Sequence, residues 1–316
     1  MYTATLVITT RNRKDELRNA LASAITQTAK LEIIVFDDAS DDGTAEMVRS
    51  EFPGVRLEAQ RQRMGYIRLR NLGASMASAP VIFSIDDDAI FTTPNVAAQV
   101  LAQFDDPRVG AVAIPFVDVR VSSAIRQMAP REGLYVAAMY IGTAHAIRRD
   151  VFFEVGQYRE FFEHQFEEPD FCRRMLSHGY VVRLGRSDVI HHFFSPKRDF
   201  GRLAYYSARN NILLTWCTVP WPQIAWRLPR SVLGSLAGAI FRPNRRSTIR
   251  GVAAGIAGVG RYSRERTPVG RDCWRLLRRL AVGPVEIDEA ARYLPRVAPF
   301  APDGPQRELG RNATAR

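Results

Sequence analysis

The chain has 316 residues, of which 46% are hydrophobic and 24% are charged. These values are ordinary for a globular protein and exclude a chain that is disordered throughout. Three cysteines with no CxxC pair exclude a disulfide framework and a cysteine-based zinc site, and they fit a reducing compartment. No run of about 18 consecutive apolar residues occurs, so no membrane-spanning helix is expected.

The net charge of +11 is spread unevenly. Residues 1–200 carry 24 Lys+Arg against 26 Asp+Glu, a balance of −2. Residues 201–316 carry the remaining 20 basic and 7 acidic residues, a balance of +13. This asymmetry predicts that the two parts of the chain face different partners.

The first hundred residues alternate between strand and helix patterns. Apolar runs of strand length lie at 6–8, 32–36, 55–58 and 80–85, and helical patterns lie at 15–26, 44–50 and 67–76. Such alternation predicts an α/β fold with a mostly parallel sheet and helices on both faces. Ligands bind such sheets beyond the carboxyl ends of the strands.

The pattern changes after residue 100. Short strands are expected at 109–114, 144–147, 180–184 and 189–192, around a helix from Pro169 to His178 that is followed by Gly179. Residues 201–282 have helical patterns and are strongly basic, whereas residues 283–316 are rich in Pro, Arg and Gly. We therefore expect an α/β domain over 1–200, a basic helical extension over 201–282, and an extended or disordered tail over 283–316.

Two of the predicted strands end in aspartates. Asp86, Asp87 and Asp88 follow the strand at 80–85, and three adjacent carboxylates repel one another unless a cation lies among them. A hard divalent ion such as Mg²⁺ or Mn²⁺ is the natural partner, and it commonly joins protein carboxylates to substrate phosphates. A solvated acidic turn is the alternative interpretation, and the position after a buried strand favours the metal site.

A second acidic pair and an arginine add to this pattern. Asp37 and Asp38 end the preceding strand, where a carboxylate can accept hydrogen bonds from a base or a ribose, or simply cap the turn. Arg70 lies between Gly65 and Gly73, so its guanidinium is near backbone that can approach closely. Arginine favours bidentate contacts with phosphate, although an ordinary exposed helical arginine is the alternative.

Together these segments resemble a known family. The run from Leu6 to Arg13, the run from Phe36 to Thr44, Arg70 with Asn71 and Gly73, and the run from Phe83 to Asp88 occur in the order and spacing of family 2 glycosyltransferases with the GT-A fold. The resemblance continues through 142–149 and through 167–174, which is similar to the family's acidic catalytic motif. It covers roughly residues 3–200.

The resemblance implies an inverting transfer of a sugar from a nucleoside diphosphate, of the UDP or dTDP type, to an acceptor hydroxyl on a glycan or a lipid-linked carrier. Cell-surface polysaccharide or glycolipid synthesis is the expected setting. The implied nucleotide contacts, with Asp38 as the expected partner of a uracil or thymine edge, are Thr10, Arg11, Asp37, Asp38, Arg70 and Asp86. The implied metal ligands are Asp88, Asp86 and His191, and Glu168 matches the position of the catalytic base.

The residues themselves agree with the assignment of Glu168. It immediately precedes Pro169 at a predicted helix N-terminus, where the helix dipole favours the ionised carboxylate that a base needs. Glu167 and Asp170 are rivals for the role, and helix capping with ion pairs to Arg173 or Arg174 is the structural alternative. His191 and His192 end a strand, so their rings point to opposite faces and only one of them can join a metal site.

The sequence departs from the family pattern in a few places. Thr9 and Arg11 stand where Pro and Tyr are more usual, and Pro169 replaces a common aliphatic residue. No GxGxxG follows the first strand and no GxxxxGK[ST] occurs, which argues against a Rossmann dehydrogenase and a P-loop NTPase. A metal-dependent nucleotidyltransferase stays open, because it too uses aspartates and a metal ion.

The basic extension supports a non-catalytic role as well. Basic surfaces bind nucleic acid or anionic membranes through the same electrostatics. Residues 213–228 contain Trp216, Trp221 and Trp226, and tryptophan beside arginine favours a membrane interface over nucleic acid. We expect a cytoplasmic protein, peripheral on the inner face of the membrane, with a helical cap on the catalytic domain as the alternative.

Overall fold

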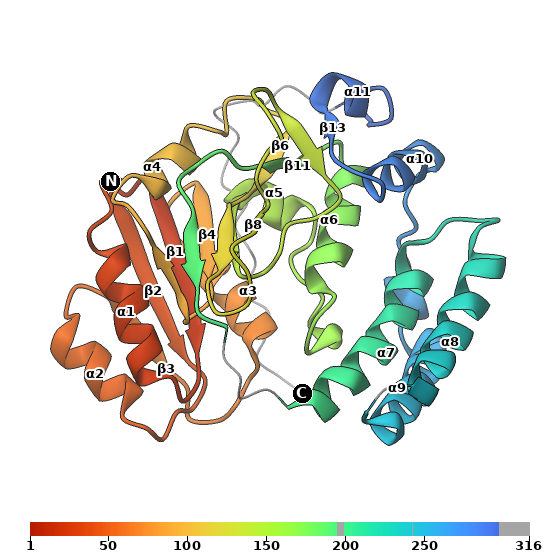
Figure 1. Ribbon diagram of the computed structural model, residues 1–316, viewed down its shortest axis with the longest axis horizontal. Coiled ribbons are helices and arrows are strands. Elements are labelled where there is room, and N and C mark those ends of the chain that lie inside the picture. The colour runs from red at the N-terminus through yellow and green to blue at the C-terminus, as the bar shows by residue number, and fades with distance from the viewer. Residues whose placement is uncertain (195–198, 242, 297–316) are drawn as a thin grey trace, which may run out of the picture.

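The computed structural model describes residues 1–194, 199–241 and 243–296 (Figure 1). Two β-sheets form its centre: a nine-stranded sheet with the order β13-β9-β11-β6-β10-β4-β1-β2-β3, and a four-stranded sheet with the order β5-β12-β7-β8. The strands are β1 (Ala4–Thr10), β2 (Leu31–Asp37), β3 (Arg56–Ala59), β4 (Val81–Ile85), β5 (Ala89–Phe91), β6 (Val109–Ala113), β7 (Phe116–Asp118), β8 (Ile125–Arg126), β9 (Tyr135–Ala137), β10 (Ala144–Arg148), β11 (Val181–Leu184), β12 (Ile190–His192) and β13 (Val285–Glu286).

The core of the large sheet is parallel. β1 pairs in parallel with both β2 and β4, and β3 joins β2 in the same direction. The carboxyl ends of β1, β2 and β4 therefore meet at one edge. β10 runs antiparallel between β4 and β6. This mixed α/β architecture with a parallel-rich sheet confirms the fold class expected from the sequence.

Helices cover both faces of the large sheet because its central strands are apolar on both sides. In β1, Leu6 and Ile8 belong to one core cluster while Val7 between them belongs to the other. The first face is covered by α1 (Lys14–Ala24), α2 (Thr44–Glu51) and α4 (Val96–Leu101), and the second by α3 (Tyr66–Met76), α5 (Arg149–Glu154) and α6 (Glu167–Ser177).

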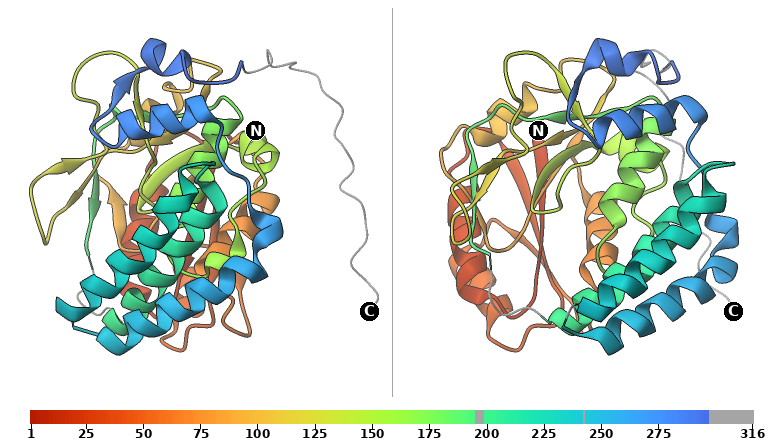
Figure 2. Two further views of the ribbon diagram at one scale, coloured as in Figure 1. Left: turned by 90° about the vertical axis from the view of Figure 1, so that its right-hand side faces the viewer. Right: turned by 45° about the vertical axis from the view of Figure 1, so that its right-hand side comes forward.

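Three long helices, α7 (Phe200–Thr218), α8 (Ile224–Phe241) and α9 (Arg245–Arg261), form a layer beside α6 (Figure 2). Leu213 and Leu214 of α7 join the core cluster that contains α6, so α7 attaches the layer to the sheet domain. α8 and α9 pack on α7 and on each other. Among the helices of the described residues, none is both long enough and apolar enough to cross a bilayer.

The chain then returns to the large sheet. α10 (Arg271–Leu280) contributes Leu276 to the core of the sheet domain, and β13 pairs with β9 at the sheet edge. α11 (Ile287–Ala291) follows directly. The sequence placed residues 283–316 in an extended or disordered tail, but 285–291 form a strand and a helix; residues 297–316 lie outside the described residues.

α7 and α9 approach so closely because glycines line their contact. A Cβ added to Gly251 would lie 2.2 Å from the backbone oxygen of Tyr205, and one added to Gly255 would lie 3.0 Å from the backbone oxygen of Arg209. A side chain at Gly251 would therefore meet backbone, which cannot rotate away as a flexible side chain can.

Replacement of Gly251 by alanine is expected to destabilise the protein. Overpacking costs about 1–3 kcal/mol, and the gain of about 1 kcal/mol in helix propensity offsets part of it. Gly260→Ala on the same helix is the matched control, because nothing lies within 4 Å of its added Cβ. The free energy of unfolding in urea tests this, and equal stability of the two variants would contradict the packing.

Candidate active site

The three aspartates predicted from the sequence lie directly beyond β4, at the carboxyl edge of the parallel strands. Asp87 and Asp88 are buried, whereas the side chain of Asp86 is 34% exposed. Asp86 is therefore the member of the group that a ligand from solvent meets first. The backbone N–H of Asp86 donates to the carbonyl of Thr143, which fixes the start of the turn.

The histidine beside these aspartates is His192. Its Nε2 lies 3.2 Å from Oδ1 of Asp88 and 3.9 Å from Oδ2 of Asp86, and its Nδ1 bonds to Asp118. The neighbouring β5 places Ala89, which follows Asp88, opposite His192. The assignment of His191 as a metal ligand does not fit this geometry, because alternation along β12 turns its ring to the other face.

A guanidinium and a hydroxyl also approach the aspartates. Nη1 of Arg13 lies 2.8 Å from both Oδ1 of Asp87 and Oδ2 of Asp88, and the hydroxyl of Thr10 donates to Asp87 over 2.8 Å. Burial raises the pKa of Asp87 to about 7, although the charge of Arg13 opposes this. Burial disfavours the charged form of His192, but Asp88 and Asp118 outweigh it and raise its pKa to about 9. The three aspartates thus have positively charged groups as neighbours, as expected for a cluster that attracts cations.

The donor set fits a divalent cation. Asp86, Asp88 and His192 each offer a ligand atom, and these atoms lie within 4.8 Å of one another. Oδ1 of Asp88 is buried and lies 3.2 Å from Nε2 of His192, so a cation bound between them would be held by both atoms. Asp118 holds Nδ1 of His192, as carboxylates commonly do behind a metal-binding histidine. The two carboxylates suit Mn²⁺ or Mg²⁺, both of which prefer oxygen ligands.

Arg70 connects this cluster to the acidic start of α6. Its Nη2 lies 3.1 Å from Oδ1 of Asp86, while its Nη1 lies 3.6 Å from Glu167 and 3.8 Å from Glu168. Arg70 is buried and its guanidinium also stacks over the ring of Tyr66. Within the protein, Arg70 is enclosed among three carboxylates, and its contact with a diphosphate stays a prediction.

The carboxylate of Glu168 is the one at the start of α6 that a substrate can reach. Its side chain is 16% exposed, whereas that of Glu167 is fully buried. Burial raises the pKa of Glu168, and the charge of Arg70 opposes the rise. Burial and the neighbouring Glu168 together raise the pKa of Glu167 well above its usual range. A Cβ at Gly142 would lie 2.2 Å from Oε1 of Glu168, so only glycine leaves room for this carboxylate.

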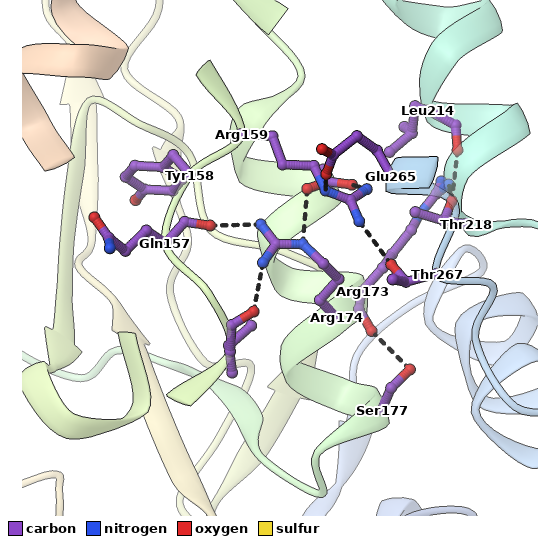
Figure 3. Close-up of polar contacts among 12 residues, drawn as sticks. Gln157, Tyr158, Arg159, Arg173, Arg174, Ser177, Leu214, Thr218, Glu265 and Thr267 are labelled. Atoms are coloured by element: carbon purple, nitrogen blue, oxygen red, sulfur yellow. Dashed lines mark hydrogen bonds and ion pairs between the residues drawn. The ribbon is translucent and has the colours of Figure 1, made fainter. Parts of the chain in front are cut away.

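Asp170, the other candidate for the catalytic base, forms two ion pairs. Its two oxygens lie 2.9 Å from Arg159 and 2.9 Å from Arg174, and it is fully buried. Figure 3 shows how the two arginines extend this network, since Arg174 also donates to the carbonyl of Gln157 and Arg159 to the hydroxyl of Thr267. Asp170 therefore joins α6 to the segment after α9.

The remaining predicted contacts line the same edge of the sheet. Asp38 accepts hydrogen bonds from the backbone N–H groups of Met64 at 2.6 Å and Gly65 at 3.1 Å, and Asp37 accepts one from Ser40 at 3.0 Å. Both carboxylates thus hold the loops that border the site. Arg11 is exposed at the end of β1. Nucleotide contacts by these residues stay a prediction.

Sequence reasoning missed Arg13 and His192. Arg13 ends the run that begins at Leu6 and carries no motif of its own, yet it is the guanidinium that reaches the aspartates. The available signal was its position three residues after the strand end at Thr10. His192 was considered as one of two adjacent histidines, and only the pairing of β12 with β5 decides between them.

Known structures share this fold. The mannosyltransferase PcManGT from Pyrobaculum calidifontis, solved in complex with GDP-Man and Mn²⁺, aligns over 92% of this chain and 87% of that chain, with a TM-score of 0.55 at 20% identity. The protein therefore has a GT-A fold, with its sheet order and with acidic residues at the carboxyl edge of the parallel strands.

Sequence relatives identify the family. Residues 5–159 match the model of glycosyl transferase family 2. Succinoglycan biosynthesis protein ExoU of Rhizobium meliloti (strain 1021) is 31% identical over 101 residues, or 31% of this chain and 29% of that protein. Validoxylamine A glucosyltransferase of Streptomyces hygroscopicus subsp. jinggangensis (strain 5008) is 34% identical over 115 residues, or 34% of this chain and 27% of that protein. The matches span less than a third of these relatives. Residues 5–159, about half of the chain, thus form a glycosyl transferase family 2 domain.

Proposed function

We propose that the protein transfers a sugar, with inversion, from a UDP- or dTDP-linked donor to an acceptor hydroxyl in cell-surface polysaccharide or glycolipid synthesis. One observation carries this proposal. Arg70 binds Asp86 of the cation-attracting cluster with one nitrogen and lies 3.8 Å from Glu168 with the other. The buried guanidinium of Arg70 thus contacts both the aspartate beside which the donor diphosphate would lie and the glutamate that the acceptor would approach.

On the donor side, Asp86, Asp88 and His192 would hold Mn²⁺ or Mg²⁺. When bound, such an ion neutralises charge on the leaving diphosphate. Thr10, Arg11, Asp37 and Asp38 stand at the ends of β1 and β2, and we assign them to the nucleotide. The family membership, and the GDP-Man and Mn²⁺ in the PcManGT structure, support this assignment.

On the acceptor side, Glu168 would take the proton of the attacking hydroxyl. As that proton moves to the carboxylate, the acceptor oxygen forms a bond to the anomeric carbon and the bond to the diphosphate breaks. The raised pKa of Glu168 makes it a stronger base than an exposed glutamate, provided that the pH leaves it ionised. Glu167 is buried and Asp170 is ion-paired, so the site offers one base, and a single displacement inverts the anomeric centre.

A donor panel tests this function. The purified protein is incubated with UDP-, dTDP- and GDP-linked sugars and Mn²⁺, and release of the nucleoside diphosphate is measured with and without glycan acceptors. We expect release from a UDP- or dTDP-sugar, and NMR of the product should show the anomeric configuration opposite to that of the donor. Retention would require a second nucleophile, and release of pyrophosphate from a nucleoside triphosphate would indicate a nucleotidyltransferase instead.

A further inference from the structure

Beyond this transfer reaction, we propose that the outer side of α8 and α9 docks on the surface of an anionic lipid bilayer. We call this side the outer helical face. It is formed by Trp226, Arg230 and Leu233 of α8 with Arg246, Arg250 and Ile256 of α9. Figure 2 shows these two helices as the part of the molecule farthest from the parallel strands.

Within the described part of the chain, the packing of the layer leaves this face uncovered. Leu228 and Val232 of α8 join Ala208 and Ile212 of α7 in a small core, together with Val252 of α9. At 3.6 residues per turn, Trp226 and Leu233 then lie on the side of α8 that faces away from α7.

The outer helical face is strongly apolar for a solvent-exposed surface. Trp226 is 52% exposed, Leu233 65% and Ile256 52%. Trp221, which lies just before α8, is also exposed. Large apolar side chains gathered in this way mark interaction surfaces, and exposed tryptophan is typical of the water–membrane interface.

The charged residues of the layer formed by α7, α8 and α9 are all basic. Residues 200–264 contain ten arginines and no aspartate, glutamate or lysine. Arg230, Arg246 and Arg250 are exposed and make no ion pair with any residue in the described part of the chain. In contrast, Arg159 and Arg174 of the sheet domain both form ion pairs with Asp170. The outer helical face therefore has uncompensated positive charge.

The combination of exposed apolar side chains and unpaired arginines favours a lipid bilayer over nucleic acid as the partner of the outer helical face. Arginines alone would suit either polyanion, since both attract them through phosphate charge. Leu233 and Ile256 gain nothing from a phosphate backbone, whereas apolar side chains between basic ones can enter the acyl region beneath lipid headgroups. Apolar insertion and charge attraction then add to each other at one surface.

The face also lies beside the proposed acceptor site. A hollow of about 410 Å³ between α7 and α8 is lined by Phe166, Asn211, Arg230 and Gly234 among others. Phe166 precedes Glu168 by two residues, and Arg230 belongs to the outer helical face. An acceptor carried on a lipid would therefore reach the base from the docked side; this step rests on the proposed function.

Flotation with liposomes tests the docking itself. The full chain is mixed with vesicles of phosphatidylcholine alone or with phosphatidylglycerol added, at low and high NaCl. We expect binding only to the anionic vesicles, and weaker binding at high salt because the attraction is screened. Replacing Arg230, Arg246 and Arg250 together by glutamine should weaken partition on the order of a hundredfold. The charge-matched control replaces Lys30, Arg49 and Arg56, which lie in or beside β2, α2 and β3, far from α8 and α9 (Figure 1).

A second pair of variants tests apolar insertion. Leu233→Ser should weaken partition on the order of tenfold, whereas Ile25→Ser, at a side chain that is 57% exposed beyond α1, should not. Unfolding curves and donor hydrolysis without vesicles show that the variants remain folded, so loss of docking is separable from loss of catalysis. The proposal is overturned if the wild type ignores anionic vesicles at low salt, if the triple arginine variant floats like the wild type, or if the protein binds DNA while ignoring vesicles.

Discussion

Replacing Glu168 by glutamine is expected to lower kcat by roughly 10²–10⁴-fold while donor binding remains near normal. Glutamine keeps the shape of the side chain beside Gly142 and Arg70 but cannot accept the proton of the acceptor hydroxyl. The nucleotide contacts that we assign lie at the ends of β1 and β2, away from this substitution. Single-turnover rates and titration with nucleoside diphosphate measure the two effects separately.

The pH profile gives an independent readout. Because burial raises the pKa of Glu168, the acid limb of kcat/KM should lie above the range of an ordinary carboxyl, with activity lost as the pH falls through it. That limb should disappear in the Glu168→Gln variant. Glu132→Gln, at an exposed glutamate, is the matched control and should behave like the wild type. Near-normal turnover in Glu168→Gln together with inactivity of Glu167→Gln would move the base by one residue.

Replacing Asp88 by asparagine should abolish most of the binding of Mn²⁺ and, with it, turnover. Asp88 is buried, and its carboxylate lies among the three groups whose ligand atoms converge, so the substitution removes a ligand charge from the centre of the site. Loss of groups that only support a metal ligand typically costs 10–100-fold in affinity, and loss of the ligand itself should cost at least about 10²-fold. Calorimetric titration with Mn²⁺ measures this without any substrate.

Asp87 offers the comparison for that experiment. It is bound by Thr10 and Arg13 and is not among the three residues whose ligand atoms converge. Asp87→Asn should therefore weaken Mn²⁺ binding much less than Asp88→Asn. Chelation should stop transfer by the wild type, and added Mn²⁺ or Mg²⁺ should restore it. Full activity in excess chelator would refute the metal site.

Much of the fold could be predicted because the central strands have unusually simple patterns. β1, β2 and β4 are short apolar runs separated by amphipathic helices, which is the pattern of parallel strands buried on both faces. Their carboxyl ends had to meet at one edge, so Asp37, Asp38 and Asp86 could be expected near one another. The strand pairs of β1 with β2 and β4 place them there.

The details of the site depended on contacts that no local pattern contains. The choice between His191 and His192 is made by the pairing of β12 with β5, which are about a hundred residues apart in the chain. The burial of Arg70 depends on Glu167 and Glu168, which belong to a different helix. Contacts between residues that lie far apart in the chain cannot be predicted from a local pattern, even where the residue types themselves suggest a functional role.

The end of the described chain was misjudged for a similar reason. Pro, Arg and Gly in residues 283–316 suggested a tail, yet Val285 and Glu286 pair with β9. Tyr135 of β9 and Arg131 both bond to Glu286. A two-residue strand has no periodicity to detect, and its partner supplies the order that its own composition does not.

The pairing of β13 with β9 has a consequence for how the protein folds. Tyr135 and Glu286 are separated by 151 positions in the chain, and the three helices of the outer layer are synthesised between them. Contacts between such distant segments form slowly, because a long loop must close before they contribute any stability. During synthesis, β9 therefore remains an unpaired sheet edge until the segment around residue 285 has emerged from the ribosome. During that interval it is a site for pairing with other nascent chains.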